Sequence, residues 1–427
     1  MNSPPMLDPG LRRRAVRLAL RLGVLLLTRG AQAQEIETVL RRLMQALGLR
    51  GGDAIVTSSS VTVSYVSPDD AETTTAIRAV RDWHYDIAQL TEASALARAM
   101  GDRRIDIAAA EAELDRIGVM TSPYPAWLRF AAPALLSAAV ALLFGGSIVD
   151  MLATFGVGLA VQPAMARIDR STLPLFFQTV FGVSATAALV IVLAALRLPI
   201  DPSLVLTGGL LRFLPGAQLV NGMRDLVARA IMPGAANLAE VVLLGVAIAM
   251  SASLVLGLGQ RLAGADLGLS TEGGVDWPPP VTVVAGMAAV IAYALQLGLP
   301  RVRLSSVAVL GAAVTAIGHG LVPLVARLDG NGRTLMAAFL VGAVGRFLAE
   351  RKREPAAIWL TPAILPLLPA PATLVPLLAE SAAAQESLRG QALTTAFLIG
   401  VGVASGDILV SAWRRHRGPG ATSVDPA

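Results

Sequence analysis

The sequence predicts a polytopic α-helical membrane protein, in which about ten transmembrane helices follow a soluble N-terminal α+β domain. Of its 427 residues, 54% are apolar and only 15% are charged, and the mean hydropathy is +0.63. These values lie well outside the range of soluble globular proteins. From Trp127 onward, apolar segments long enough to cross a bilayer recur at short intervals, and none precedes it.

Residues 1–125 predict the soluble domain. A first helix turns at Gly30, and a second runs to about Leu47, where Gly48 closes it as a C-cap. Strands are expected at residues 54–59, 61–66 and 73–80, and further helices at 86–100 and 106–117.

The extreme N-terminus also has features of a signal peptide. It carries Arg12-Arg13-Arg14, the short apolar run LGVLLL and a small-residue triplet at 31–33. Arg17 and Arg21 interrupt the apolar stretch, which favours a helix of the domain instead.

The N-terminal domain carries no recognisable catalytic pattern. It has no nucleophile elbow, HExxH motif or phosphate loop, and His84 is expected at the surface or at the edge of the core. Glu37 is expected to be a helix-face charge beside Arg41, its i+4 neighbour. Cysteine is absent, so disulfides and thiolate metal sites are excluded. We therefore expect no enzyme, no metal and no cofactor.

Two motifs of this domain, together with the strand segment DAIVTSSSVTVSY and the LPG of the membrane part, resemble the threonine/serine exporter family. The motifs L-x-L-G-x-x-L-L-x-x-G-A and I-E-x-x-L are carried by Leu20, Gly23, Leu26, Leu27, Gly30, Ala31, Ile36, Glu37 and Leu40. Glu35 departs from the family, which often has a basic residue just before the I/V-E pair. The resemblance implies a soluble domain, about ten spans, and export of threonine and serine driven by the proton gradient.

The membrane part divides into two groups of five apolar segments. They are expected near 126–146, 148–165, 173–196, 203–223, 237–260, 279–299, 304–326, 333–350, 356–378 and 391–412. The predicted domains are a soluble domain at 1–125, a first five-helix repeat at 126–262, a linker at 263–277, a second repeat at 278–413 and a tail at 414–427.

The basic residues predict the orientation in the membrane. Loops on the side of the N-terminal domain hold about twice as many of them as the opposite loops, among them Arg167, Arg224, Arg301 and Arg351. We therefore expect the protein in the bacterial inner membrane, with both termini in the cytoplasm. Because the arginines form short clusters between apolar segments, the net charge of +5 does not indicate nucleic-acid binding.

A broken helix recurs in the two halves. Residues 206–215 (LTGGLLRFLP) resemble residues 360–369 (LTPAILPLLP), and residues 243–255 resemble 398–410. Since each half has an odd number of spans, the halves are expected to thread the bilayer in opposite senses, as inverted repeats suited to alternating access. A duplicated scaffold without a transport function is the alternative.

The broken helices are the candidate substrate site. An ionised Arg212 inside the membrane costs about 2.5–3.5 kcal/mol and should face a partner or a wet cavity, although a structural ion pair or a snorkelling anchor is equally compatible. Pro215 and Gly216 should leave carbonyls free near Leu211. The candidates are Thr207, Arg212, Pro215, Gly216, Gln218 and Asn221, with Thr361 and Pro369 in the second half. Gln218 and Asn221 should share a face, either for substrate or as polar contacts between helices.

The candidates for proton coupling are His319, Asp407, Asp225 and Arg346. Arg346 would be the counterion of Asp407, unless it only begins the basic inner loop. Arg224 is explained by its place at the cytoplasmic end of its span. Glu240, at the start of the fifth span, is a weaker candidate.

The leading interpretation is thus a proton-coupled secondary exporter of threonine and serine, surrounded by membrane lipid and compatible with a homo-oligomer. One alternative is export of a small carboxylate such as succinate, which an intramembrane arginine would suit. Another is a membrane-anchored enzyme or sensor that acts through its soluble domain.

Overall fold

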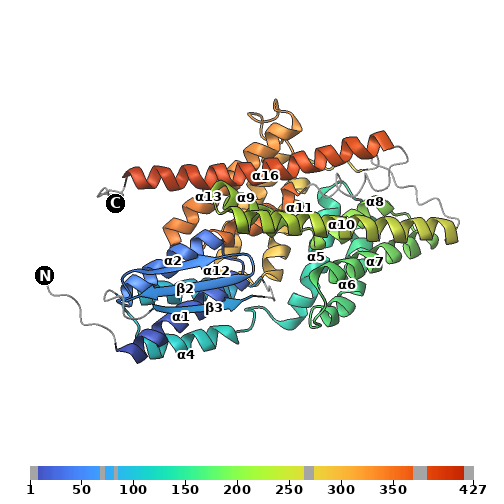
Figure 1. The fold of residues 1–427 in the computed structure, drawn as a ribbon. Helices are drawn as coiled ribbons and strands as arrows, with labels where there is room; N and C mark the ends of the chain where they lie inside the picture. Colours follow the sequence, from blue (N-terminus) through green and yellow to red (C-terminus); the bar gives the residue numbers. More distant parts are fainter. Residues whose placement is uncertain (1–7, 68–72, 81–84, 264–273, 369–381, 418–427) are drawn as a thin grey trace.

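The computed structural model describes residues 8–67, 73–80, 85–263, 274–368 and 382–417. Its N-terminal part is an α+β domain (Figure 1). The elements are α1 (Pro9–Thr28), α2 (Ala33–Ala46), β1 (Gly52–Val56), β2 (Ser60–Val66), β3 (Thr73–Ala79), α3 (Ile87–Gly101) and α4 (Ile107–Gly118). The three strands form an antiparallel sheet in the order β1-β2-β3. The expected helices and strands of this region are all confirmed, and His84 lies outside the described residues.

Local signals set these elements. Gly30 and Gly48 adopt φ values of +99° and +83° after α1 and α2, where a side chain would be strained. Alternate residues of β2, including Val61 and Val63, are buried against α1 and α2. Gly23 allows this packing, because a Cβ there would crowd Leu40 and Val61.

The membrane part consists of long apolar helices (Figure 1). They are α5 (Ala126–Leu143), α6 (Ile148–Ile168), α7 (Leu175–Ala195), α8 (Pro202–Leu210), η1 (Leu211–Phe213), α9 (Gly216–Val227), α10 (Ile231–Ala263), α11 (Pro279–Gln296), α12 (Arg301–Gly318), α13 (Gly330–Lys352), α14 (Ala357–Ala363), η2 (Leu365–Leu367) and α16 (Ala382–Arg417). Within the described residues, eight helices are long and apolar enough to cross a membrane, or nine if the bent pair α8–η1 and α9 is one span. The expected ninth span continues beyond Leu368, outside the described residues, so the count of ten stays a prediction.

The repeat extends to the secondary structure. Corresponding elements of the two halves begin or end 153 to 155 residues apart: α5 with α11, α6 with α12, α7 with α13, η1 with η2, and α10 with α16. The chain leaves η1 and η2 in the same conformation, with φ/ψ of −70°/129° at Leu214 and −62°/131° at Leu368. Packing follows the same scheme, since α5 contacts α6 and α8 as α11 contacts α12 and α14.

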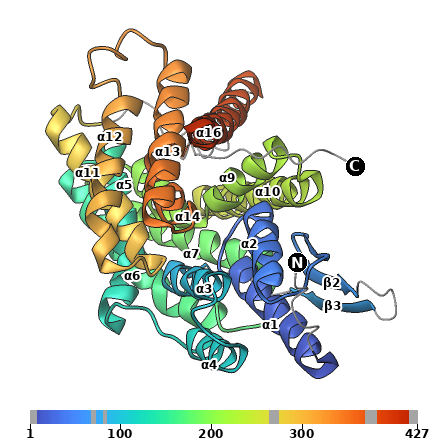
Figure 2. The ribbon, with the colours of Figure 1, turned by 90° about the vertical axis from the view of Figure 1, so that its left-hand side faces the viewer.

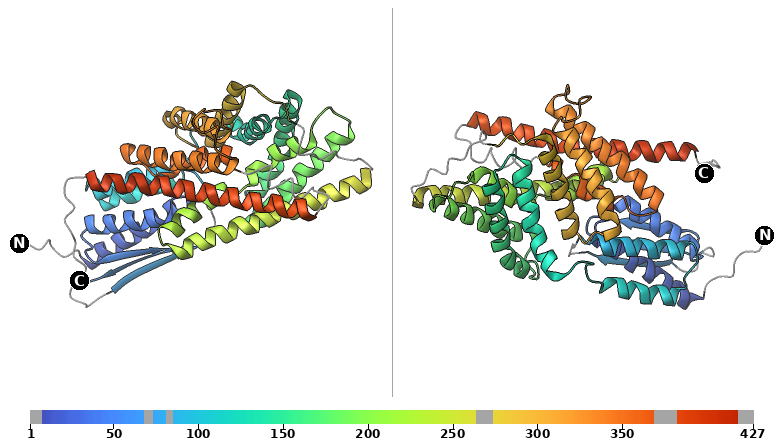
Figure 3. Two further views of the ribbon diagram at one scale, coloured as in Figure 1. Left: turned by 90° about the horizontal axis from the view of Figure 1, so that it is seen from above. Right: turned by 180° about the vertical axis from the view of Figure 1, so that it is seen from behind.

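The two halves contact each other through α5 and α11 and through the broken helices. Helices α10 and α16 run in opposite directions (Figures 1 and 3). A Cβ added at Gly216 would lie 3.1 Å from a methyl group of Leu368, so the breaks of the two halves are in contact. Pro369, the next residue, lies outside the described residues.

The α+β domain packs against one side of the helix bundle (Figure 2). The backbone N–H of Ile87 donates to the carbonyl of Leu297 at 2.9 Å, and the Tyr124 hydroxyl donates to the carbonyl of Leu299 at 2.6 Å. These bonds hold the start of α3 and the chain before α5 on the turn between α11 and α12. The N-terminal domain is thereby fixed at one end of the membrane helices.

Candidate functional site

A cavity of about 460 Å³ opens beside the first broken helix, and we refer to it as the central cavity. Arg212, Pro215 and Gln218 contribute from the break and from α9, and Glu240 contributes from α10. The far end of α11 adds Tyr293 and Gln296, and the N-terminal domain adds Ser58 and Tyr85. The cavity therefore joins both halves of the membrane part with the N-terminal domain.

Arg212 is the cation of the central cavity. Its Nη1 donates to Oε1 of Gln162 at 2.6 Å, and its guanidinium carbon lies 5.1 Å from the ring centre of Phe213. Among the described residues, no carboxylate lies within 4 Å of it. Its hydrogen-bond partner among the described residues is thus a neutral amide, with the Asp169 carboxylate farther away on the same cavity, and a buried guanidinium in that setting can bind a further anion.

The break places Arg212 at the cavity. Pro215 has no N–H, so the chain cannot continue from η1 into α9 as one α-helix. The carbonyl of Leu211, expected to be free, instead accepts the N–H of Leu214 at 3.1 Å. For Leu211 the expectation was wrong, because the last turn before the break tightens to a 3₁₀ helix and satisfies this group locally, while for the carbonyl of Arg212 it stays a prediction.

Asp169 and Glu240 are the carboxylates of the central cavity. The sequence made Glu240 only a weak candidate, yet its position is central to this cavity. It accepts a hydrogen bond from the side chain of Gln218. Helix α10 begins at Ile231, six residues before the predicted start, so Glu240 lies inside the helix and faces α9. Pro233 and Gly234 obscured this start, yet a proline in the first turn of a helix leaves no backbone bond unmade.

Tyr85 connects the family-like motif of the N-terminal domain to the central cavity. Its ring lies on Gly30, where an added Cβ would overlap the ring atoms. Burial raises the pKa of Tyr85, so its hydroxyl remains a proton donor at neutral pH. Sequence reasoning missed Tyr85, because a tyrosine in a loop carries no local sign of its long-range neighbours.

Among the described residues, the other predicted substrate-site residues, Thr207, Gly216, Asn221 and Thr361, do not line this cavity. Thr207 and Thr361 are buried in the packing of α8 and α14. Asn221 lines a neighbouring cavity of about 10 Å³ together with Asp225 and Asn237. Gln218 and Asn221 thus face two adjacent cavities.

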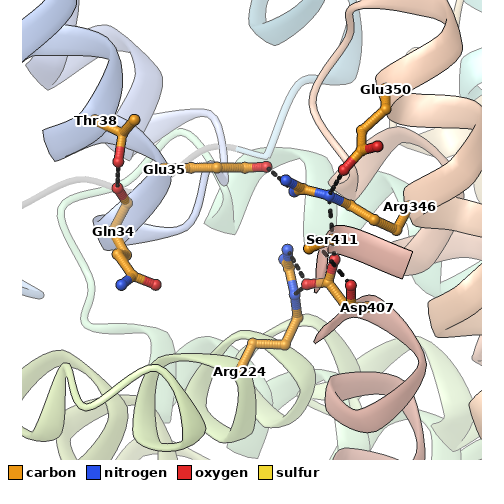
Figure 4. A network of polar contacts seen from close by, with 8 residues as sticks. All are labelled: Gln34, Glu35, Thr38, Arg224, Arg346, Glu350, Asp407 and Ser411. Atoms are coloured by element: carbon orange, nitrogen blue, oxygen red, sulfur yellow. Dashed lines mark hydrogen bonds and ion pairs between the residues drawn. The ribbon is translucent and has the colours of Figure 1, made fainter. Parts of the chain in front are cut away.

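A network of charges links α9, α13, α16 and the N-terminal domain (Figure 4). Oδ2 of Asp407 accepts from Nη2 and Nε of Arg224 at 2.8 and 2.9 Å. Nε of Arg346 lies 3.5 Å from the other oxygen of Asp407 and 2.7 Å from Glu350, and its Nη1 lies 3.5 Å from Glu35. Glu35, the residue that departs from the family motif, is therefore the contact of the N-terminal domain with this network.

The network corrects the sequence reading of Arg224. Its side chain is only 2% exposed, and that of Asp407 is 13% exposed. Arg224 is therefore not a solvated loop charge, because its guanidinium is enclosed with the carboxylate that neutralises it.

Of the other coupling candidates, Asp225 lies beside the network and His319 does not join it. Asp225 is buried and accepts a hydrogen bond from Gln32 of the N-terminal domain, while its Oδ1 has no hydrogen-bond partner. Nδ1 of His319 lies 3.1 Å from the Thr315 carbonyl oxygen, at the end of α12. The described residues contain no group of three His, Asp or Glu side chains that could hold a metal ion.

Glu37 is not a free helix-face charge. Its Oε1 accepts the backbone N–H of Val56 at 3.0 Å, and Arg41 instead donates to the Glu37 backbone carbonyl. The expected i+4 ion pair was wrong, because the unpaired N–H at the end of β1 provides a fixed partner for the carboxylate. This contact fastens α2 to the sheet, which is a structural role.

The chain is similar to known transport proteins. A family model described as "putative threonine/serine exporter" matches residues 17–259. A "probable threonine/serine exporter" of Mycobacterium tuberculosis is 28% identical over 425 residues, which cover 95% of this chain and 78% of the relative. A "threonine/serine exporter" of Corynebacterium glutamicum is 24% identical over 358 residues, or 82% of this chain and 73% of the relative.

A third relative has a different printed cargo. The "probable succinate transporter subunit YjjP" of Klebsiella aerogenes is 25% identical over 244 residues, which cover 56% of this chain and 92% of the relative. No solved structure is significantly similar to the chain. Its apolar helices and its bacterial relatives make the chain a multi-pass membrane protein of bacteria. Because the family model matches more than half of its length, the chain belongs to the threonine/serine exporter family.

Proposed function

We propose that the protein exports threonine and serine across the inner membrane, and that the central cavity binds them. The observation that carries this proposal is that one cavity holds a guanidinium, Arg212, together with carboxylates, of which Glu240 lies on α10 and Asp169 at the end of α6. An α-amino acid is a zwitterion, so its carboxylate can accept from the Arg212 guanidinium while its ammonium group donates to Glu240. The hydroxyl groups of Tyr85 and Tyr293 are suited to bind the side-chain hydroxyl.

We further propose that the two halves are inverted repeats that alternate between inward-open and outward-open states. The shift of 153 to 155 residues between corresponding elements and the opposite directions of α10 and α16 support this. Similar packing used in two orientations allows two states of similar energy. With both termini in the cytoplasm, the N-terminal domain would lie at the inner end of the helices.

Asp225 is our candidate for the proton carrier. Asp407 and Asp225 each have one oxygen without a hydrogen bond, but Asp407 is held by two guanidinium groups, whereas among the described residues Asp225 has no guanidinium within 4 Å. A buried carboxylate with no cation in direct contact takes up a proton at a lower cost than one held in an ion pair. Efflux driven by a pH gradient should therefore be lost in Asp225→Asn, with downhill exchange of threonine retained.

The test is efflux of preloaded labelled threonine from cells or vesicles, with and without an imposed pH gradient. Removing a hydrogen bond to a charged group costs about 1.5–3 kcal/mol, so Arg212→Gln should slow efflux about 10- to 100-fold. Arg261→Gln, at the exposed end of α10, is the matched control and should leave efflux unchanged. Unaltered efflux in Arg212→Gln would rule out the cavity as the substrate site.

Export of a small dicarboxylate is the second candidate, favoured by the succinate-linked relative and by Arg212. Glu240 opposes it, because a carboxylate in the cavity repels a second negative charge. Glu240→Gln should therefore weaken threonine efflux and strengthen succinate efflux. Faster succinate than threonine efflux in the wild-type protein would replace the first proposal with this one.

Transport also accounts for the site better than catalysis does. An enzyme or sensor acting through its N-terminal domain would be inactivated by changes confined to residues 1–125 and would tolerate Arg212→Gln.

A further inference from the structure

A second cavity, of about 840 Å³, lies between the N-terminal domain and the membrane helices. We refer to it as the interdomain cavity. Helices α2 and α3 form one side, and the end of α13 with the chain up to Pro355 forms the other. It is larger than the central cavity and is separate from it, since the two share no lining residue.

The carboxylates that line the interdomain cavity are all neutralised by arginines. Glu35 pairs with Arg346 at 3.5 Å, Asp102 with Arg104 at 3.0 Å, Glu350 with Arg346 and Arg414 at 2.7 and 3.0 Å, and Glu354 with Arg303 at 2.6 Å. Arg104, Arg303 and Arg414 do not line the cavity. Together with Arg346, these three arginines neutralise the carboxylates, so the other arginines of the cavity are not needed for this.

Four other arginines of the cavity have no carboxylate partner among the described residues. Among the described residues, none of Arg42, Arg98, Arg103 and Arg353 has a carboxylate within 4 Å, and all four line the cavity. Burial lowers the pKa of Arg98, the charges of Glu354 and Asp102 oppose this shift, and repulsion from the nearby charge of Arg353 adds to it. A counter-anion would remove this repulsion and stabilise both charged groups.

Part of the cavity wall, on the side of the N-terminal domain, is apolar. Leu26, Ile36 and Leu43 line it and belong to the buried core of the N-terminal domain. A ligand that fits has a compact anionic group for the arginines and an apolar or neutral portion for this wall. Guanidinium groups bind phosphate oxygens in a bidentate manner, and several of them together suit a group with more than two acceptor oxygens.

We propose that the interdomain cavity binds a phosphate-bearing anion, with its phosphate oxygens on Arg42, Arg98, Arg103 and Arg353. The phosphate can belong to the headgroup of an anionic phospholipid or to a soluble phosphate ester. Arg346 lines the same cavity and also contacts Glu35 and Asp407, so an anion there competes with Glu35 for Arg346. If the proposed transport function holds, occupancy would loosen the contact of the N-terminal domain with the charge network.

The binding test uses the purified full-length protein and does not depend on transport. Fluorescent phosphatidylglycerol is titrated in neutral detergent, with phosphatidylcholine as the uncharged comparison, and glycerol 3-phosphate is titrated separately at fixed ionic strength. The variants are Arg42→Gln/Arg98→Gln, the single variant Arg353→Gln, and the control Arg116→Gln, whose arginine pairs with Glu113 on α4 and, like it, does not line the cavity. Size-exclusion elution verifies that each variant is folded.

We expect at least a ten-fold loss of anion affinity in the double variant and a smaller loss in Arg353→Gln, with Arg116→Gln unchanged. Tight binding of phosphatidylglycerol alone identifies a lipid headgroup, and tight binding of glycerol 3-phosphate identifies a soluble ester. Equal binding of phosphatidylcholine and phosphatidylglycerol without any response to glycerol 3-phosphate overturns the proposal. So does equal loss in Arg116→Gln and in the cavity variants.

Discussion

The buried pair of Arg224 and Asp407 makes a quantitative prediction for Asp407→Asn. The change leaves an enclosed guanidinium with a neutral partner, and removing one member of a buried ion pair costs about 3–5 kcal/mol. On the entropy scale of globular proteins, this corresponds to a fall of about 3–6 °C in the melting temperature of a chain of this length. The assay is thermal unfolding of the purified protein, in which size exclusion measures the fraction that remains folded after heating.

A surface pair provides the comparison. Arg414 is 36% exposed where it contacts Glu350, so Arg414→Gln should cost only about 0–1 kcal/mol. The double variant Arg224→Gln/Asp407→Asn should be no less stable than Asp407→Asn, because neither charge is then left unpaired. Equal losses in Asp407→Asn and Arg414→Gln, or additive losses in the double variant, would refute the reasoning.

Three other predictions concern the N-terminal domain. Gly30→Ala should lower the free energy of unfolding by about 2–5 kcal/mol, because alanine is strained at a φ of +99° and its Cβ would overlap Tyr85. Gly101→Ala, with open space around it, is the control and should be neutral or stabilising by up to about 1 kcal/mol in the same melting assay. Adding Tyr85→Ala to Gly30→Ala should recover the part due to overlap, and no recovery would contradict the assigned contact. Burial raises the pKa of Asp86 above 3.8, so the folded protein binds this proton more tightly than the unfolded chain does. The free energy of unfolding should therefore fall as the pH rises from 3.8 through the pKa of the folded state. Asp86→Asn keeps the N-cap of α3 and should make the free energy of unfolding less dependent on pH in this range.

Features set by neighbours along the chain were predictable from the sequence. Gly30 and Gly48 ended helices where expected, and Pro215 broke the helix that it interrupts. The repeat could also be recognised in the sequence, because identical residues recur at corresponding positions of 206–215 and 360–369. The backbone has the same conformation where the chain leaves both breaks. In each case the cause is a local steric or hydrogen-bonding constraint.

Features set by distant neighbours were not predictable. Arg224 and Asp407 are 183 residues apart, and an arginine near the end of an apolar segment looks like a solvated anchor until its partner is located. Glu240 and Gln218 meet only because α9 and α10 fold back on each other. Which cavity a polar side chain faces depends on this packing, which hydropathy does not encode.

The length of α10 has a geometric consequence for how the protein sits in a bilayer. Its 33 residues extend about 50 Å at 1.5 Å per residue, compared with a hydrocarbon thickness of about 30 Å. Tilt alone would have to exceed about 50° to submerge this rod, beyond the 0–40° seen for transmembrane helices. Some of α10 must therefore overhang the lipid. Its first turns adjoin the corner at Ala228, whose carbonyl accepts from Gln34, so the N-terminal domain contacts the protein at this end of α10.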